Sequence, residues 1–216
     1  MKISTHYRQD PDEGIPDELR DFLDKEYFNE LPYVAASNPK VLVVFAGGNA
    51  VGKSTLARRL EETFKGLRIE NDAIKELIIK RHPELAHDDK RHHLTWQYTM
   101  DLYKRLDSLT SNGLVIRDGT IAWYYDRLLP IFEKQGYKIF VIGYDLSEQK
   151  MRSLIDKRGD TPTTTASRLH QILPDHFVHN SRFFAAYPPD IMLTDENLFE
   201  YDPVITALQK ELEYSK

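Results

Sequence analysis

The sequence predicts an α/β protein with a three-layer fold around a five-stranded parallel sheet. From Val41 onward, short apolar runs alternate with longer stretches of helical periodicity. Such alternation is typical of strand-helix-strand units, which place helices on both faces of parallel strands. The strand candidates are VLVVFA (41–46), LRIEN (67–71), LVIRD (114–118), KIFVIGY (138–144) and DIMLT (190–194).

Helices are expected where apolar residues recur every three or four positions. A capping-box spacing of Asp145 and Glu148 also indicates a helix start, and Gly159 suits the end of that helix. The other expected helices span about 16–28, 54–64, 73–81, 94–109 and 202–213.

Length and composition favour one domain over residues 1–216, with a helical extension at 1–40 packed on its core. The net charge of -5 gives no global attraction to a nucleic-acid backbone, so nucleic acid is not an expected partner. The chain has no cysteine, and neither an apolar signal region nor a membrane-length apolar run is visible. We therefore expect a cytoplasmic protein without a membrane partner.

A glycine-rich loop directly follows the first strand and opens a helix. Residues 47–55, GGNAVGKST, match the phosphate-loop pattern G-x-x-x-x-G-K-[ST]. Backbone N–H groups and the helix N-terminus would hold the phosphates of ATP, Lys53 would reach the β- and γ-phosphates, and the Ser54 hydroxyl would bind Mg²⁺. This motif makes the fold P-loop NTPase/kinase-like. The expected nucleotide-binding residues are Gly47, Gly48, Asn49, Ala50, Val51, Gly52, Lys53, Ser54 and Thr55.

Two aspartates follow strands, at the sheet edge where ligands of α/β proteins bind. Asp72 follows the second strand and can accept the proton of an acceptor hydroxyl, or it can cap the next helix. Asp118 ends the third strand and can steer Mg²⁺ through water or bind substrate. We hypothesise that both are catalytic.

An arginine-bearing lid is expected at about residues 147–180. Arg152 and Arg158 lie about 120° apart on an ideal helix, so they cannot act side by side. If Gly159 ends the helix, Arg158 can fold over the phosphates and stabilise the transferring phosphoryl group. The alternative is a solvated, charged helix end.

Other polar and aromatic residues give weaker signals. Four histidines have no acidic residue or cysteine at the spacing that metal ligands need. Their pattern favours a solvated helix face over a metal site. Aromatic residues around position 123 can stack on a base but are more often core, and residues 195–197 can lie near the adenine or form a turn. These residues are His82, His87, His92, His93, Trp96, Trp123, Tyr124, Tyr125, Asp195, Glu196 and Asn197.

Three segments, read in order, resemble the zeta-toxin family of P-loop kinases, the toxins of bacterial toxin–antitoxin pairs. The phosphate loop is followed by IENDAIKELIIKRHPEL (69–85), similar to the family's N-D-x-x-K segment with His-Pro, and by NGLVIRDGT (112–120), similar to its strand ending in acid-Gly-Thr. RGDTP (158–162) is similar to the end of its arginine region. The chain departs from the family at IAW (121–123).

The resemblance implies ATP-dependent phosphorylation of the 3′-hydroxyl of UDP-N-acetylglucosamine. It implies Lys53 on the phosphates, Asp72 as base and Asp118 as a second acid, with Arg152 and Arg158 as the lid arginines. It also places the second and third strands on one side of the first, and it implies a separate antitoxin as partner.

Two other functions remain open. The protein can be a P-loop kinase for another acceptor, such as a nucleoside, a sugar or a polynucleotide end. It can also be an ATP-binding switch that transfers no phosphate. A guanine-reading N-K-x-D segment is absent from the sequence, which disfavours a GTPase.

Overall fold

The computed structural model describes residues 14–32, 39–86, 90–106, 113–161 and 164–214. The chain divides into two compact units, residues 1–32 with 70–109 and residues 33–69 with 110–216. Our expectation of one domain over residues 1–216 stays a prediction. Expectations that involve His87, Leu109 or Pro162 lie outside the described residues.

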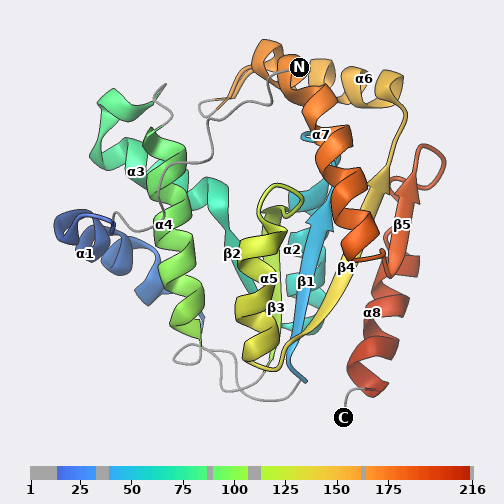
Figure 1. The fold of residues 1–216 in the computed structure, drawn as a ribbon, viewed down its shortest axis with the longest axis horizontal. Helices are drawn as coiled ribbons and strands as arrows, with labels where there is room; N and C mark the ends of the chain where they lie inside the picture. Colours follow the sequence, from blue (N-terminus) through green and yellow to red (C-terminus); the bar gives the residue numbers. More distant parts are fainter. Residues whose placement is uncertain (1–13, 33–38, 87–89, 107–112, 162–163, 215–216) are drawn as a thin grey trace. The chain divides into compact units, whose positions relative to one another are not determined.

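The larger unit is built on a five-stranded sheet in the order β2-β3-β1-β4-β5, which confirms the predicted fold class (Figure 1). β1 runs parallel to both β3 and β4, and β4 runs parallel to β5. The second and third strands lie on one side of β1, as the resemblance implied. The strands are β1 (Val41–Ala46), β2 (Leu67–Glu70), β3 (Leu114–Thr120), β4 (Lys138–Asp145) and β5 (Ile191–Thr194).

Helices flank this sheet and cover its apolar residues. Every residue of β1 is buried, as expected for a central strand of a parallel sheet, and leucines of the helices join the same core. The predicted helices near 54–64 and 202–213 are confirmed. The helices of this unit are α2 (Lys53–Phe64), α5 (Tyr125–Lys134), α6 (Glu148–Arg158), α7 (Ala166–Ala186) and α8 (Asp202–Tyr214).

Two helix features differ from the sequence prediction. The start of α6 is capped by Ser147, whose hydroxyl accepts a hydrogen bond from the Lys150 backbone N–H, so the predicted capping box of Asp145 and Glu148 is wrong. Asp145 is instead the last residue of β4. Helices α5 and α7 were not predicted, because each contains an internal proline that interrupts the helical pattern. Gly159 ends α6 with a φ of 67°, as predicted.

The third strand bulges beside the phosphate loop. Between the pairs Val43↔Ile116 and Phe45↔Thr120, β1 advances by two residues while β3 advances by four. Gly119 has a φ of 144° within this bulge. A bulge redirects side chains locally, and here it sets the direction of Asp118 at the edge of the sheet.

The smaller unit contains α1 (Asp17–Glu26), α3 (Asn71–Arg81), α4 (Lys90–Lys104) and the short helices η2 (Phe28–Glu30) and η3 (Pro83–Leu85). α3 packs against both α1 and α4. Asp24 is a polar centre of this unit, because its carboxylate accepts hydrogen bonds from the Tyr98 hydroxyl at 2.8 Å and from both terminal nitrogens of Arg105 at 2.8 Å. Burial works against the charged carboxylate, but the hydrogen bonds of Arg105 and Tyr98 outweigh it and lower the pKa of Asp24.

Within the described ranges, no helix has both the length and the apolar character needed to span a membrane.

Replacing Asp24 with alanine is expected to destabilise the smaller unit by about 1–3 kcal/mol, because Arg105 and Tyr98 lose their shared acceptor. Urea denaturation followed by circular dichroism measures this change. Asp17→Ala is the matched control on the same helix, since its carboxylate is 93% exposed and pairs with Arg20 only at 3.3 Å. Equal stability of the two variants would show that the Asp24 contacts do not stabilise the unit.

Candidate active site

The phosphate loop joins β1 to α2, as the motif predicts. Gly52 precedes the helix with a φ of 88°, in the left-handed region that favours glycine, and α2 begins at Lys53. No acidic residue lies in the first turn of α2. The N–H groups of that turn and the helix dipole therefore suit an anion.

The first two glycines of the loop lie close to neighbouring side chains, and the contact at Gly47 leaves no room for a Cβ. A Cβ on Gly47 would lie 2.7 Å from Cβ of Tyr144, which is on β4. A Cβ on Gly48 would overlap Cε of Met151, which is on α6. The glycines of the motif thus allow the loop to lie directly against β4 and α6. They also allow a phosphate group to approach the loop backbone.

The Lys53 side chain lies over its own loop. Its ammonium donates hydrogen bonds to the carbonyl oxygens of Gly48 and, at 3.5 Å, of Gly47, and the residue is 8% exposed. The positive charge is therefore held at the loop that the motif assigns to phosphates.

Ser54 and Asp118 meet at the end of the sheet, although 64 positions separate them in the chain. The Ser54 hydroxyl donates to Oδ1 of Asp118 at 2.7 Å, and the Arg68 guanidinium donates to Oδ2 at 2.9 Å. Because the Asp118 side chain is only 2% exposed, Arg68 balances its buried charge. Arg68 also pairs with Glu61 at 2.7 Å.

A hydroxyl beside a carboxylate is the oxygen pair that P-loop proteins offer to Mg²⁺. The hydroxyl oxygen of Ser54 and the carboxylate oxygens of Asp118 are ligands of the kind that Mg²⁺ prefers. Phosphate and water oxygens would have to complete its shell, since the described residues contain no cluster of three or more His, Cys, Asp or Glu side chains able to hold a metal.

Asp72 lies in the first turn of α3, two residues after β2 ends. Its carboxylate is about half exposed and pairs with Lys75 at 2.6 Å. The residue that precedes α3 is Glu70, so the alternative in which Asp72 caps this helix is wrong. The exposed carboxylate remains accessible to a substrate.

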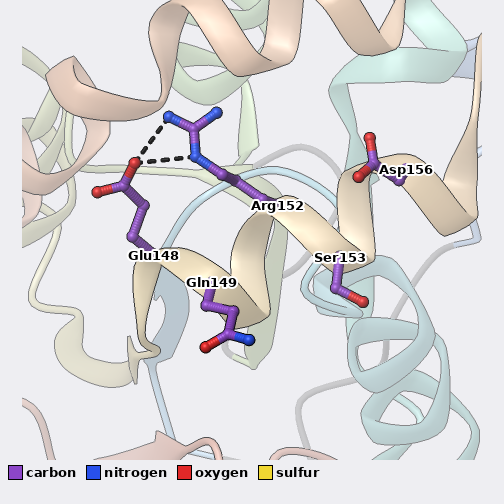
Figure 2. A pocket seen from close by; sticks show the side chains of 5 residues that line it. All are labelled: Glu148, Gln149, Arg152, Ser153 and Asp156. Carbon is purple, nitrogen blue, oxygen red and sulfur yellow. Dashed lines mark hydrogen bonds and ion pairs between the residues drawn. The ribbon is translucent and has the colours of Figure 1, made fainter.

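The two arginines that the sequence predicts for a lid, Arg152 and Arg158, have different surroundings. Figure 2 shows the Arg152 guanidinium turned back toward Glu148, to which it donates two hydrogen bonds at 2.9 and 2.7 Å. Both residues line an open hollow of about 620 Å³ along α6, together with Gln149, Ser153 and Asp156. Arg158 is exposed in the last turn of α6, next to Gly159. The structure thus separates the two arginines, as predicted from their spacing.

One group of polar residues at the loop was not predicted. His176 on α7 is 3% exposed, its Nε2 lies 3.0 Å from the side-chain amide of Asn49, and its Nδ1 accepts a hydrogen bond from the Trp123 indole at 3.2 Å. Trp123 also stacks on His179, with ring centroids 3.9 Å apart. The side chain of Asn49, a residue of the phosphate loop, thus contacts a helix that lies 127 positions further along the chain.

The weaker candidates have mainly structural contacts. Asp195 accepts hydrogen bonds from the backbone N–H and hydroxyl of Ser147, and Asn197 accepts one from the Thr194 N–H. The turn interpretation of this segment is therefore supported. Nearby, Phe199 is 60% exposed, and its ring lies 3.6 Å from the position that a Cβ on Gly52 would take.

Residues 42–176 match the family model described as AAA domain, which is more than half of the chain. The chain belongs to the AAA domain family. This match extends from the second residue of β1 to His176 and includes the phosphate loop, Asp72, Asp118, Arg152 and Arg158. No curated protein matches the sequence significantly.

Solved structures share the fold of this AAA domain protein at low sequence identity. One comes from the PezAT chromosomal toxin–antitoxin system of Streptococcus pneumoniae, with a TM-score of 0.61 and 16% identity over 84% of this chain and 79% of that chain. A putative kinase from Chloroflexus aurantiacus has a TM-score of 0.56 and 16% identity, over 84% and 100% of the two chains. Shikimate kinase from Bacteroides thetaiotaomicron has a TM-score of 0.51 and 13% identity, over 80% and 98%. These similarities show the P-loop kinase-like fold.

Only some of the residues around the loop can be recognised from local sequence patterns. Trp123 was identified as a stacking candidate, but its hydrogen bond to a histidine 53 positions away depends on the tertiary structure. Arg68 occupies an alternating strand pattern that does not reveal its ion pair with Asp118. His176 lies in α7, a helix for which there was no prediction.

The stability of the protein is expected to fall with acidification through His176. Burial, followed by the charges of Lys53 and His179, lowers the pKa of His176 to about 3. The unfolded chain therefore binds the proton near pH 6.5, whereas the folded protein does not, so stability falls as the pH drops below about 6.5.

The titration of His176 alone is expected to lower the free energy of unfolding by about 2 kcal/mol between pH 7 and pH 5. Urea denaturation at both pH values measures the loss, and His176→Gln is expected to show a loss smaller by that amount. An identical pH dependence in this variant would contradict the buried neutral state of His176.

Proposed function

We propose that this protein is an ATP-dependent phosphotransferase that transfers the γ-phosphoryl group to a hydroxyl of a small molecule. The observation that carries this proposal is the 2.7 Å contact of Ser54 with Asp118, next to a phosphate loop whose lysine lies over it. This contact would bring together two oxygen ligands for the metal ion that phosphoryl transfer requires, beside the loop proposed to bind phosphate.

The nucleotide would be held mainly by the loop and the first turn of α2. Lys53 would exchange its hydrogen bonds to the loop carbonyls for bonds to phosphate oxygens. The exposed ring of Phe199, beside Gly52, offers an apolar surface for the base. When bound with ATP, Mg²⁺ would neutralise phosphate charge, and Ser54 and Asp118 are the residues that would hold it.

Asp72 is the proposed base for the acceptor hydroxyl. It follows a strand of the sheet, and its half-exposed carboxylate is accessible. Lys75 would keep this carboxylate oriented through their 2.6 Å ion pair. A carboxylate can take the acceptor proton as the phosphoryl group leaves ATP.

The lid arginines are proposed to stabilise the charge of the transferring group. Arg158, exposed at the end of α6 and next to Gly159, has the freedom to reach an anion. Arg152 would first have to give up its bonds to Glu148. Arg158 is therefore the stronger candidate for direct contact.

A sugar nucleotide such as UDP-N-acetylglucosamine is the proposed acceptor, in a cytoplasmic setting. Support comes from the segments around Asp72, Asp118 and Arg158 that resemble the zeta-toxin family, and from the fold shared with a structure of the PezAT toxin–antitoxin system. The same support makes a separate antitoxin a candidate partner. The shared fold of a shikimate kinase keeps another small hydroxyl compound as the alternative acceptor.

The acceptor is tested by Mg·ATP turnover against UDP-sugars, nucleosides, shikimate and oligonucleotide 5′ ends, with products identified by mass spectrometry. We expect one phosphorylated product, and Asp72→Asn should lower its rate by about a hundredfold or more while ATP affinity stays unchanged. Glu76→Gln is the matched control, because Glu76 is exposed one turn later on α3. Equal rates for wild type and Asp72→Asn would refute the role of Asp72.

ATP hydrolysis without any phosphorylated acceptor would favour an ATPase or a nucleotide switch within the AAA domain family. Binding of ATP with neither hydrolysis nor transfer would favour the switch alone.

Lys53→Ala is expected to weaken Mg·ATP binding about tenfold or more, because a charge-assisted contact to phosphate is lost. Isothermal titration calorimetry measures this affinity without any acceptor. Arg58→Ala removes an exposed cation from the same helix and is expected to leave the affinity unchanged. A comparable loss in both variants would indicate a general charge effect instead of a specific lysine contact.

A further inference from the structure

The contacts of His176 define the state of its imidazole ring. The Trp123 indole N–H can only donate a hydrogen bond, so Nδ1 of His176, at 3.2 Å, must be the acceptor. A neutral imidazole with a lone pair on Nδ1 carries its proton on Nε2. His176 therefore donates from Nε2.

This donation fixes the orientation of the Asn49 amide. The atom that lies 3.0 Å from Nε2 must be an acceptor, which is the amide oxygen. The two ends of an amide have the same shape and are distinguished by their hydrogen bonds, and here the bonds place Oδ1 of Asn49 toward Nε2 of His176. Held by its oxygen, the amide keeps its two N–H donors for another acceptor.

The part of the loop next to Asn49 is strained. Ala50 has a φ of 64°, a left-handed conformation that a residue with a Cβ adopts only when its surroundings hold it. Two residues later Gly52 is also left-handed, with a φ of 88°. The Asn49–His176 hydrogen bond is a side-chain anchor directly beside this strained residue.

We infer that His176 is a positioning residue, which holds Asn49 through its Nε2–H and so fixes the phosphate loop in the conformation that receives a nucleotide. Trp123, on the segment that follows β3, holds the ring of His176 in turn. The inference rests on the proposed nucleotide-binding function. It assigns a role to an asparagine and a histidine that the phosphate-loop motif does not specify.

Two substitutions of His176 each keep one of its two hydrogen bonds and remove the other. A glutamine amide reaches the place of Nε2 and can still donate to Asn49, whereas an asparagine amide reaches only the place of Nδ1 and can accept from Trp123. We expect His176→Gln to bind Mg·ATP within about threefold of wild type, and His176→Asn to bind about tenfold more weakly, the loss that one hydrogen bond predicts. Calorimetric titration measures both affinities, and thermal melting confirms that each variant is folded.

A double-mutant cycle tests whether the effect passes through Asn49. Asn49→Ala alone is expected to weaken Mg·ATP binding about tenfold, and adding His176→Asn to it should change the affinity by less than about twofold. Additive losses, about a hundredfold in total, would overturn the inference. His179→Asn is the matched control, because His179 stacks on the same tryptophan without a bond to Asn49, and a loss equal to that of His176→Asn would also overturn it.

Nitrogen-resolved NMR of the imidazole ring tests the contact without nucleotide. A neutral His176 with its proton on Nε2 is the expected result, and a proton on Nδ1 would overturn the inference. If wild-type protein binds no Mg·ATP, the proposed function fails, whereas the spectrum still decides whether His176 donates to Asn49.

Discussion

The buried carboxylate of Asp118 imposes the main physical constraint on this structure. A charge that is removed from water is costly unless other groups balance it. Arg68 supplies a cation at 2.9 Å and Ser54 supplies a hydroxyl at 2.7 Å. The strand that carries Asp118, the strand that carries Arg68 and the helix that begins at the phosphate loop are thereby joined at one point. Sheet and loop are not independent, because the bulge in β3 directs the carboxylate toward that point.

A second set of contacts connects the loop to the C-terminal half of the protein. Tyr144 and Met151 occupy the space that side chains at Gly47 and Gly48 would need, and His176 binds Asn49. The motif therefore combines two requirements at the same residues. Its glycines permit both anion binding and close packing, so substitutions there would change both properties together.

The sequence predicted the sheet well because parallel strands buried on both faces are continuous apolar runs, as in Val41–Ala46. It also predicted the residues that a short local motif specifies, such as Lys53 and Ser54. It could not predict the partners of Asp118 or Asn49, because Arg68 and His176 come together with them only in the folded chain. The interrupted pattern at Pro130 and Pro174 concealed α5 and α7, and with α7 the position of His176.

The anchoring of α6 extends over most of its length. Its first turn is tied to the segment after β5 through the bonds of Ser147 to Asp195, and one turn later Met151 packs against Gly48. Its second half is anchored as well, because Ile155 is buried and Asp156 pairs with His170 of α7 at 2.7 Å. The side chains of Lys157 and Arg158, in the last turn before Gly159, are exposed and can change conformation without disturbing these contacts. Arg152, in contrast, can turn away only by breaking its two hydrogen bonds to Glu148.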